Sequence, residues 1–278
     1  VVKDTAGRPT GLLQGATARG ASSKIPPPTP DQYAASVRWA LEQAATHGIT
    51  SFVEARTDRA TLSAYADRDR SAGLSARLAA YLQYDTEFEP QSAQEATVSG
   101  RAEFRGPRIA VNFVKLYLDG VPPNFSAALL SPYGEAAHKL GQGFRGDLRM
   151  KQQRIDEVVA AMDKAGISVK MHATGDASVR AGLDAVAAAR QANGANGVMH
   201  SIAHVGLVEA QDLPRFKQLN VAADIAPPIW IPGGYSQAMV TSIGRERYAR
   251  YIPTADLLKP GALVIYGSDW PSIAASIN

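Results

Sequence analysis

The sequence contains no cysteine among its 278 residues. Disulfide bonds, thiolate metal ligands and a cysteine nucleophile are therefore excluded, while the redox state of the compartment is left open. No stretch approaches the roughly 18 uninterrupted apolar residues that a membrane-spanning helix needs. The net charge is +3, and lysine and arginine are scattered rather than gathered in a basic block that could bind nucleic acid. We expect neither a membrane nor a nucleic acid as a partner.

Two well-known site signatures are also missing. The sequence has no Gly-x-Ser-x-Gly segment of the kind that presents a serine nucleophile. No glycine-rich turn follows the first predicted strand, where a doubly wound nucleotide-binding sheet usually carries one. Serine hydrolysis through that motif and dinucleotide binding are both disfavoured.

What the sequence does contain is a regular alternation of apolar and helical segments. Strands are predicted from apolar, β-branched runs at Ile49 to Ala55, Ser75 to Tyr84, Arg108 to Leu118, Ile167 to His172, His200 to Val205, Val221 to Ile225 and Ala262 to Gly267. Helical patterns of roughly ten to sixteen residues separate most of these strands. Strands that are apolar on both faces and alternate with helices are typical of a parallel sheet covered by helices.

Polar residues at the ends of several strands favour a barrel over a doubly wound sheet. His172, His204 and Asp269 each follow a different apolar run, and Lys115 lies inside another. A doubly wound sheet concentrates its site at one switch point, whereas an α/β barrel gathers residues from the C-terminal ends of many strands. We therefore predict one α/β domain over residues 1–278, a TIM-type (β/α)8 barrel of which seven strands are recognisable.

Three segments fall outside the alternation. Residues 1–30 are rich in glycine and proline and are predicted to form an N-terminal connecting arm. Residues 119–150 and 226–260 follow strands at the predicted active face and are too long to be plain turns. Because long connections at such a face more often enclose a substrate than stand idle, we expect both to lie over the site.

His172, His204 and Asp269 have the chemistry of a divalent metal site. Two neutral imidazoles and a carboxylate suit Zn²⁺, and a coordination position left to water makes such a site catalytic. A water on the metal can ionise near neutral pH, and a nearby carboxylate can take its proton. The alternative is that the histidines are structural hydrogen-bonding residues and that Asp269, before Trp-Pro, only forms a turn. Spacing alone does not decide between the two.

Lys115 is unusual because it lies within an apolar strand. Desolvation of its ammonium should lower its pKa. A neutral amine at this position can form a Schiff base with a carbonyl, or take up CO₂ and bridge metal ions as a carbamate. The alternative is an ordinary lysine whose charged end reaches water at the end of the strand. A Schiff-base aldolase is the less favoured chemistry, because it leaves the two histidines and Asp269 without a role.

Three further residues are candidates for supporting His172 or for contacting a substrate. Asp119 follows the strand of Lys115, and Trp270 follows Asp269 directly. Asp176 begins the helix after His172, where it either caps the helix or orients the imidazole by a hydrogen bond. His200, in contrast, starts its strand and is expected at the opposite end of the sheet from the site.

Four motifs, in their order and intervals, resemble the metal-dependent amidohydrolase superfamily: Val-Lys-Leu-Tyr-Leu-Asp-Gly, His-Ala-Thr-Gly-Asp, Ile-Ala-His-Val and Tyr-Gly-Ser-Asp-Trp-Pro. The branch that they resemble most is amidohydrolase family 3, which includes N-substituted formamide deformylases. The resemblance runs along essentially the whole chain. It implies a distorted (β/α)8 barrel with one or two divalent metal ions, expected to be zinc, at the C-terminal ends of the strands.

The resemblance also implies roles for individual residues. Lys115 would be the fourth-strand lysine, carboxylated and bridging two metals, and His172 and His204 would be the fifth- and sixth-strand ligands. Asp269 would bind metal and act as the general base, with His204 beside it as a second catalytic residue. The implied reaction is hydrolysis of a C–N bond in a small amide, formamide or cyclic amide by metal-activated water.

The sequence departs from this family in one respect. The family's first strand carries a His-x-His pair that completes the metal site, and this sequence contains none. The seven predicted strands then correspond to the second to eighth, and the last barrel helix and both parts of the family's terminal β-sandwich are not found. We therefore expect a piece of a longer enzyme, whose open barrel edge favours association between copies. The alternative is a catalytically incomplete barrel that only binds a ligand or partner.

The cellular location is predicted only coarsely. We expect a cytoplasmic protein, because the sequence shows no signal peptide. The chain opens on Val1 rather than on a methionine, however, which leaves a signal peptide upstream open.

Overall fold

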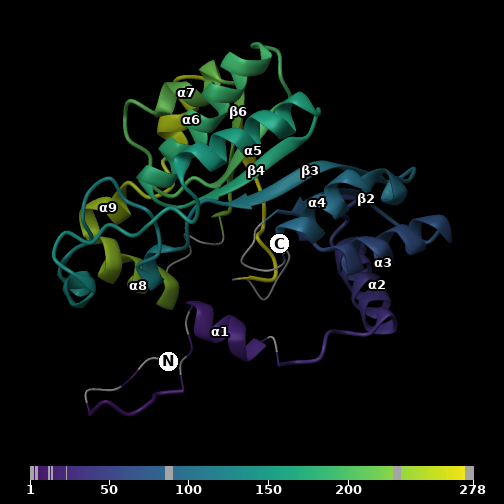
Figure 1. Cartoon of the computed structure of the whole chain (residues 1–278), viewed down its shortest axis with the longest axis horizontal. Helices are drawn as coiled ribbons and strands as arrows, with labels where there is room; N and C mark the ends of the chain where they lie inside the picture. Colours follow the sequence, from purple (N-terminus) through teal and green to yellow (C-terminus); the bar gives the residue numbers. More distant parts are fainter. Residues whose placement is uncertain are drawn as a thin grey trace.

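The computed structural model describes residues 3, 6–11, 13, 15–22, 24–84, 90–227 and 233–272. Within these residues, seven parallel strands form one sheet whose spatial order is their order along the chain. The strands are β1 (Ser51–Thr57), β2 (Arg77–Gln83), β3 (Ile109–Tyr117), β4 (Ser168–Ala173), β5 (His200–His204), β6 (Val221–Ile225) and β7 (Val264–Tyr266). The sheet is an open, curled half-barrel, so the predicted incomplete (β/α)8 barrel is confirmed (Figure 1).

Helices follow most of the strands, as the alternating pattern predicts. They are α2 (Pro30–Thr46), α3 (Arg59–Arg70), α4 (Gln91–Ser99), α5 (Gln152–Lys164), α6 (Asp176–Asn193) and the short α7 (Leu213–Gln218), with a 3₁₀ turn η1 (Arg101–Phe104) after α4. The start of α2 follows from local chemistry, because Thr29 and Gln32 form a reciprocal capping box and Pro30 opens the helix.

The two faces of the sheet differ in character. On the outer face, Val114 and Leu116 of β3 and Val169 and Met171 of β4 are fully buried. The intervening residues point into the curl of the sheet, where Lys115 pairs in register with Lys170 of β4. This alternation, which is a direct consequence of the two-residue period of a strand, places the polar residues together on the inner face.

The segments outside the alternation contain short helices that the sequence does not predict. The arm over residues 1–30 includes α1 (Gly15–Ser22), which lies away from the sheet (Figure 1). The segment 119–150 contains the 3₁₀ turns η2 (Pro122–Asn124) and η3 (Glu135–Leu140). The segment 226–260, of which residues 228–232 lie outside the described part, contains α8 (Gly234–Ile243), α9 (Arg245–Ala249) and α10 (Thr254–Leu258).

The two long connections are packed against each other. A second apolar cluster, separate from the main core, joins Leu129 and Tyr133 from the first connection to Met239 and Ile243 of α8 from the second. Arg247 of α9 also donates to the backbone carbonyl of Pro132. The two segments therefore form one cap beside the C-terminal ends of the central strands, rather than two independent loops.

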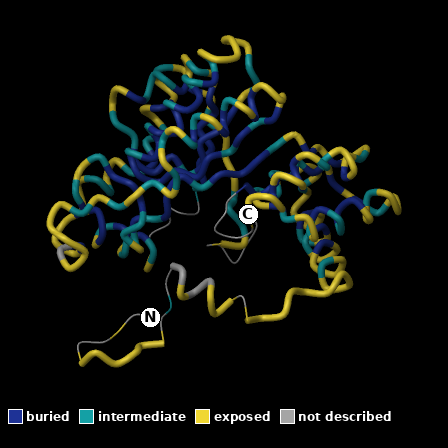
Figure 2. Tube along the Cα trace, viewed as in Figure 1, coloured by how far each residue is buried: buried dark blue, intermediate teal, exposed yellow. Residues whose placement is uncertain are grey.

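Burial is concentrated in the middle of the sheet. In Figure 2 the central strands are dark blue, whereas the outer strands are more exposed. Val53 of β1 is 48% exposed and Tyr266 of β7 is 62% exposed. Across the described ranges, no helix combines the length and apolarity that a membrane crossing requires.

His200 starts β5 and is fully buried, at the far end of the strand from His204, as predicted. Its Nδ1 accepts from the backbone N–H of Val169 at 3.0 Å, and its Nε2 donates to Asp163 at 3.1 Å. Burial is the main cause that holds the pKa of His200 below its ordinary value; the Arg190 charge adds to this, and the hydrogen bond to Asp163 opposes it. The ring is therefore neutral in the folded chain.

We expect His200 to make the fold less stable in acid. The folded ring resists protonation, whereas the unfolded chain takes up a proton below the ordinary histidine pKa of about 6.5. The stability that this group contributes is complete above that value and is lost as the pH falls toward the lowered folded pKa. Between about pH 7.5 and about pH 5.5, the free energy of unfolding in urea should fall more for the wild-type chain than for His200→Asn.

His47→Asn is the matched control for this comparison. His47 is an exposed histidine at the end of α2, where its Nδ1 lies 2.9 Å from the carbonyl oxygen of Gln43. This variant removes an exposed histidine in place of the buried one, so the two variants can be compared directly. An identical pH dependence in His200→Asn and the wild-type chain would show that His200 does not resist protonation in the fold.

Candidate metal site

His172 and His204 are brought together at the C-terminal edge of the sheet. His172 lies near the end of β4, and His204 is the last residue of β5, opposite Ala173 in the parallel register. Their ring centroids are 4.5 Å apart and the rings meet edge to face, at 65°. Two residues that are 32 positions apart in the sequence thus share one small volume because adjacent parallel strands end side by side.

Both rings are neutral in the folded chain. Burial lowers the pKa of His172 to about 3, with the nearby charge of Lys115 acting in the same direction. Burial also holds the pKa of His204 well below its usual range, assisted by His172 and Lys115. A neutral imidazole keeps one nitrogen lone pair, which is the form that binds metal ions.

The hydrogen bond of His172 shows which of its nitrogens keeps the lone pair. Nε2 lies 2.9 Å from the carbonyl oxygen of Gly120. A carbonyl oxygen only accepts, so Nε2 carries the proton and Nδ1 carries the lone pair. Ligand histidines are commonly held in this way, with one nitrogen bonded to the protein and the other left for the metal.

The backbone at two predicted ligands is in an uncommon conformation. His204 has a φ of 74°, Val205 has a φ of 46° and Asp269 has a φ of 52°. Left-handed φ is rare outside glycine, and for a β-branched residue such as Val205 it is a true outlier. The turn after β5 is held by the bond from Leu207 N–H to the Thr174 carbonyl, at 3.0 Å. Strain of this kind persists where a surrounding structure imposes it, and it gathers at functional sites.

Lys115 lies below the histidines on the inner face and is only 3% exposed. Burial, with the charge of Lys170 acting in the same direction, lowers its pKa to about 7 against the opposing charges of Asp224 and Asp269. Its Nζ is 5.1 Å from the centre of the Tyr117 ring. The lowered pKa predicted from the apolar strand is therefore present.

Asp269 follows β7 and faces the same interior. Burial raises its pKa, while the charges of Lys115 and Lys170 act in the opposite direction. Tyr235, the second residue of α8, lies near this carboxylate: burial first and the charge of Asp269 second raise the pKa of its phenol to about 12. Asp269 is thus within electrostatic reach of the lysines, and α8 contributes to the same side of the site.

The types of donor atom at the site suit a borderline metal ion. The number of donors among the described residues is too small to complete a coordination shell. In the part of the chain that the structure describes, no three His, Asp or Glu side chains lie close enough together to hold a metal ion. Two imidazoles with free lone pairs are present, beside a buried amine and a carboxylate. Imidazole nitrogen and carboxylate oxygen are ordinary zinc ligands. The described residues therefore provide part of a coordination shell.

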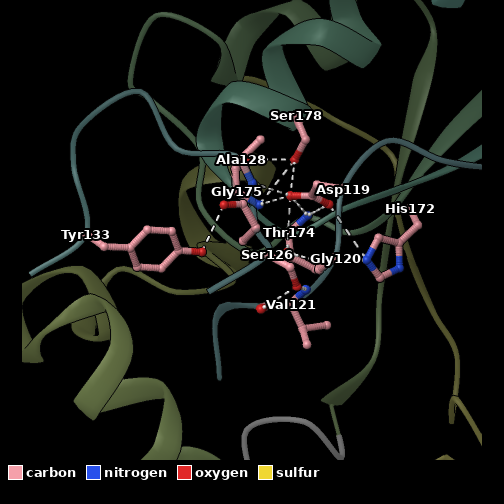
Figure 3. Close-up of polar contacts among 11 residues, drawn as sticks. Asp119, Gly120, Val121, Ser126, Ala128, Tyr133, His172, Thr174, Gly175 and Ser178 are labelled. Atoms are coloured by element: carbon pink, nitrogen blue, oxygen red, sulfur yellow. Dashed lines mark hydrogen bonds and ion pairs between the residues drawn. The ribbon is translucent and has the colours of Figure 1, made fainter. Parts of the chain in front are cut away.

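Asp119 is the most completely hydrogen-bonded side chain beside the site (Figure 3). It follows β3 and is fully buried, at the N-terminal end of α6. Burial raises its pKa to about 6, although hydrogen bonds from Ser178, Gly175, Ala128 and Thr174 all act to lower it. Its Oδ1 lies 3.7 Å from Nε2 of His172, too far for a hydrogen bond; the ring is neutral, so the contact is not an ion pair.

Asp176 lies at the start of α6, and Trp270 lies against α2. Asp176 is the first residue of α6, which has Gly175 as its N-cap, and its Oδ1 accepts from the backbone N–H groups of Leu130 and Ala177 at 2.7 and 3.0 Å. It therefore ties the first long connection to α6 instead of bonding to His172. Trp270 stacks on Trp39 of α2, with ring centroids 5.5 Å apart. This contact links the segment after β7 to α2, which precedes β1 in the chain.

One pair of inner-face residues was not anticipated from the sequence. Lys170 and Asp224 form an ion pair inside the curl of the sheet, with side chains only 12% and 10% exposed. The ammonium of Lys170 also lies 5.4 Å from the centre of the Tyr81 ring. A signal was available, because Lys170 lies two positions before His172 and must therefore share its face of β4. Asp224, near the end of β6, follows the same pattern of polar strand ends.

Two curated proteins and one solved structure illustrate what the chain resembles. It is 29% identical over 167 residues to Protein LONG AFTER FAR-RED 3 of Arabidopsis thaliana, covering 59% of this chain and 27% of that protein. It is 25% identical over 193 residues to the Exoenzymes regulatory protein AepA of Pectobacterium carotovorum subsp. carotovorum, covering 68% and 40%. The chain thus spans less than half the length of either relative.

The solved structure is that of an uncharacterized metal-dependent hydrolase from Pyrococcus furiosus. The two folds superpose with a TM-score of 0.74 at 24% identity, over 93% of this chain and 50% of the other. This likeness shows a shared fold. A model of the amidohydrolase family matches residues 1–276, which is nearly the whole sequence. The chain therefore belongs to the amidohydrolase family.

Proposed function

We propose that this chain carries the metal site of a hydrolase that cleaves a C–N bond in a small amide, formamide or cyclic amide. The observation that carries the proposal is the pair of neutral imidazoles of the buried His172 and the partly buried His204, 4.5 Å apart at the C-terminal edge of the sheet. In α/β barrels this edge is where active sites lie. Membership of the amidohydrolase family supports the same chemistry.

The residues of the site suggest separate roles in metal binding and in proton transfer. His172, through Nδ1, and His204 would hold the metal, together with Asp269 and with Lys115 as a carbamate. When bound, one or two divalent ions, most simply zinc, would polarise the scissile carbonyl and make water acidic near neutral pH. Asp269 would take a proton from the attacking water onto its carboxylate and return it to the leaving nitrogen.

Two features of the chain support these roles. The strained backbone at His204, Val205 and Asp269 holds both predicted ligands in fixed directions at the strand ends. The cap formed by residues 119–150 and 226–260 lies beside these ends and can exclude bulk water from a bound substrate. The inner face of the sheet supplies the fixed charges of Lys170 and Asp224 below.

Metal content is the experiment that tests the proposal. We expect the purified chain, after incubation with Zn²⁺ and desalting, to retain zinc by elemental analysis, and His172→Ala to lose it, because the variant removes one of two adjacent nitrogen donors. Formate release from N-substituted formamides and ring opening of cyclic amides should stop on chelation and return with Zn²⁺.

His47→Ala serves as the control, because His47 is exposed on α2 and should not change the retained zinc. A folded wild-type chain that retains no metal would contradict the proposal. It would leave the second interpretation of the sequence, a barrel that binds a ligand or partner without catalysis. Equal zinc in the wild type and His172→Ala would show that the metal lies elsewhere.

A further inference from the structure

We infer that Asp119 is a positioning residue, whose carboxylate fixes the Gly120 carbonyl so that His172 keeps its proton on Nε2 and presents Nδ1 to the site. The inference rests on the proposed role of His172 as a ligand. It concerns the protein's own hydrogen bonds and so can be tested without metal.

The carboxylate of Asp119 ties the loop that follows it to the segment Thr174 to Ser178, which is distant in the sequence. Its Oδ2 accepts from the N–H of Ala128 at 3.0 Å, from the N–H of Gly175 at 2.9 Å and from the hydroxyl of Ser178 at 2.6 Å. Its Oδ1 accepts from the N–H of Thr174 at 3.1 Å. A buried carboxylate at the N-terminal end of α6 is well suited to these donors, because it can only accept. Figure 3 shows all of these bonds converging on one side chain.

The space around these bonds leaves no room for adjustment. A Cβ on Gly175 would lie 1.9 Å from the carbonyl oxygen of Ala128, and a Cβ on Gly120 would lie 2.1 Å from the hydroxyl of Ser126. Glycine is therefore required at both positions. The loop from Asp119 to Ala128 is held closely against the start of α6, and it cannot shift without breaking the bonds to Asp119.

The backbone orientation of Gly120, on both sides of its Cα, follows from this anchoring. Its N–H donates to the carbonyl of Ser126 at 2.8 Å. Its oxygen accepts from the hydroxyl of Thr174 at 2.6 Å and from Nε2 of His172 at 2.9 Å. Both lone pairs of the carbonyl are thus engaged, one by the turn that Asp119 holds and one by the imidazole.

Two acceptors consequently lie on the Nε2 side of His172. The Gly120 oxygen takes the proton directly, and the Asp119 carboxylate, 3.7 Å from Nε2, adds a negative charge on the same side. Both groups stabilise the tautomer with its proton on Nε2 relative to the tautomer with its proton on Nδ1. A supporting carboxylate that selects the tautomer of a ligand histidine also makes the other nitrogen a better donor.

Asp119→Asn tests the inference, because the new amide has two N–H donors that would face the N–H groups of Thr174, Gly175 and Ala128. In the metal-free wild type, ¹⁵N NMR should show one protonated and one unprotonated nitrogen for His172. The chain has five histidines, so the spectrum of His172→Ala identifies this ring. In Asp119→Asn the two nitrogen shifts should move toward each other, and zinc affinity should fall by about 10- to 100-fold.

Asp163→Asn is the matched control. Asp163 is also a buried aspartate that accepts from a histidine, through its contact with Nε2 of His200. The Asp163→Asn variant should alter the NMR signals of His200 and leave those of His172 unchanged, even if it destabilises the fold as much as Asp119→Asn does. If Asp119→Asn does not fold, Ser178→Ala removes the shortest hydrogen bond to Asp119 and should produce a smaller change in the same direction.

Unchanged His172 nitrogen shifts in a folded Asp119→Asn, or in Ser178→Ala where the first does not fold, would overturn the inference. The two proposals fail separately. A wild-type chain that binds no zinc would refute the metal site, and the NMR result in the metal-free chain would still decide the role of Asp119. Normal zinc binding with unchanged shifts would refute the role of Asp119 alone.

Discussion

Replacing Asp269 with asparagine is expected to lower amide hydrolysis by about 10²- to 10⁴-fold, because an amide cannot accept the proton of the attacking water. The carboxylate is partly buried. Desolvation raises its pKa and the charges of Lys115 and Lys170 oppose this, so the group can accept a proton and release it again. The measurement is the rate of formate release or ring opening by the zinc-loaded chain, at equal zinc content in the wild type and the variant.

Asp256→Asn is the control for this experiment. Asp256 lies on α10 and pairs with Lys259, and both side chains are more than half exposed, at 51% and 75%. Its replacement should leave the rate unchanged. If Asp269→Asn were fully active with its zinc retained, Asp269 would not be the general base and the proposed mechanism would be wrong.

Replacing Asp224 alone with leucine should cost about 3 to 5 kcal/mol of folding free energy, because it leaves the ammonium of Lys170 buried without a partner. The two side chains are 12% and 10% exposed and lie between the central strands, where water cannot easily replace the lost contact. The double variant Lys170→Met with Asp224→Leu should recover most of this loss, because two apolar side chains of similar volume can pack together without leaving a buried charge. Urea denaturation in the presence of a chelator measures both effects without a contribution from metal.

Glu157→Gln provides the comparison with a surface pair. Glu157 contacts Arg154 at 3.5 Å, and both side chains are about half exposed, at 51% and 41%. Exposed pairs contribute about 0 to 1 kcal/mol, so this variant should be close to the wild type. If Asp224→Leu were as stable as Glu157→Gln, the Lys170 charge would have another partner or access to water, and the buried pair would not hold the sheet.

Much of the fold could be predicted from the sequence because its signals are local. Each of the seven strands is an apolar run, and a capping box and a proline mark the start of α2. Helix bounds follow less directly where polar residues interrupt the pattern: the connection after β5 becomes helical only at Leu213, after the turn around Asp212. The short helices of the two long connections have too few residues to show a period.

The sequence indicates candidate residues for the site more readily than it indicates their contacts. Polar residues at strand ends led to Lys115, His172, His204 and Asp269, and the structure places the first three close together on the inner face and at its edge. The partner of an individual side chain depends on how loops return to the sheet, which no spacing encodes. Proximity in the sequence suggests Asp176 as the partner of His172, whereas the Gly120 carbonyl, which bonds to the ring, comes from the connection after β3.

Lys170 and Asp224 show a different limit of sequence reasoning. Their positions on the inner face follow from the strand period, but their pairing depends on the register of β4, β5 and β6, in which Lys170 aligns with Ser201, and Asp224 with Ala203. Register is fixed by side-chain packing over the whole sheet and not by either residue alone. Only the assembled strands could therefore reveal the ion pair.

The order of the strands also determines how the sheet can be assembled. Each strand from β2 onward pairs with the strand that precedes it in the chain, so no strand has to enter between two that are already paired. Each added unit of strand and helix closes a loop only to its immediate predecessor, which keeps the entropy of closure small. Since chains emerge from the ribosome N-terminus first, this sheet can grow one strand at a time during synthesis. The two histidines, on β4 and β5, would meet before the strand that precedes Asp269 has been made.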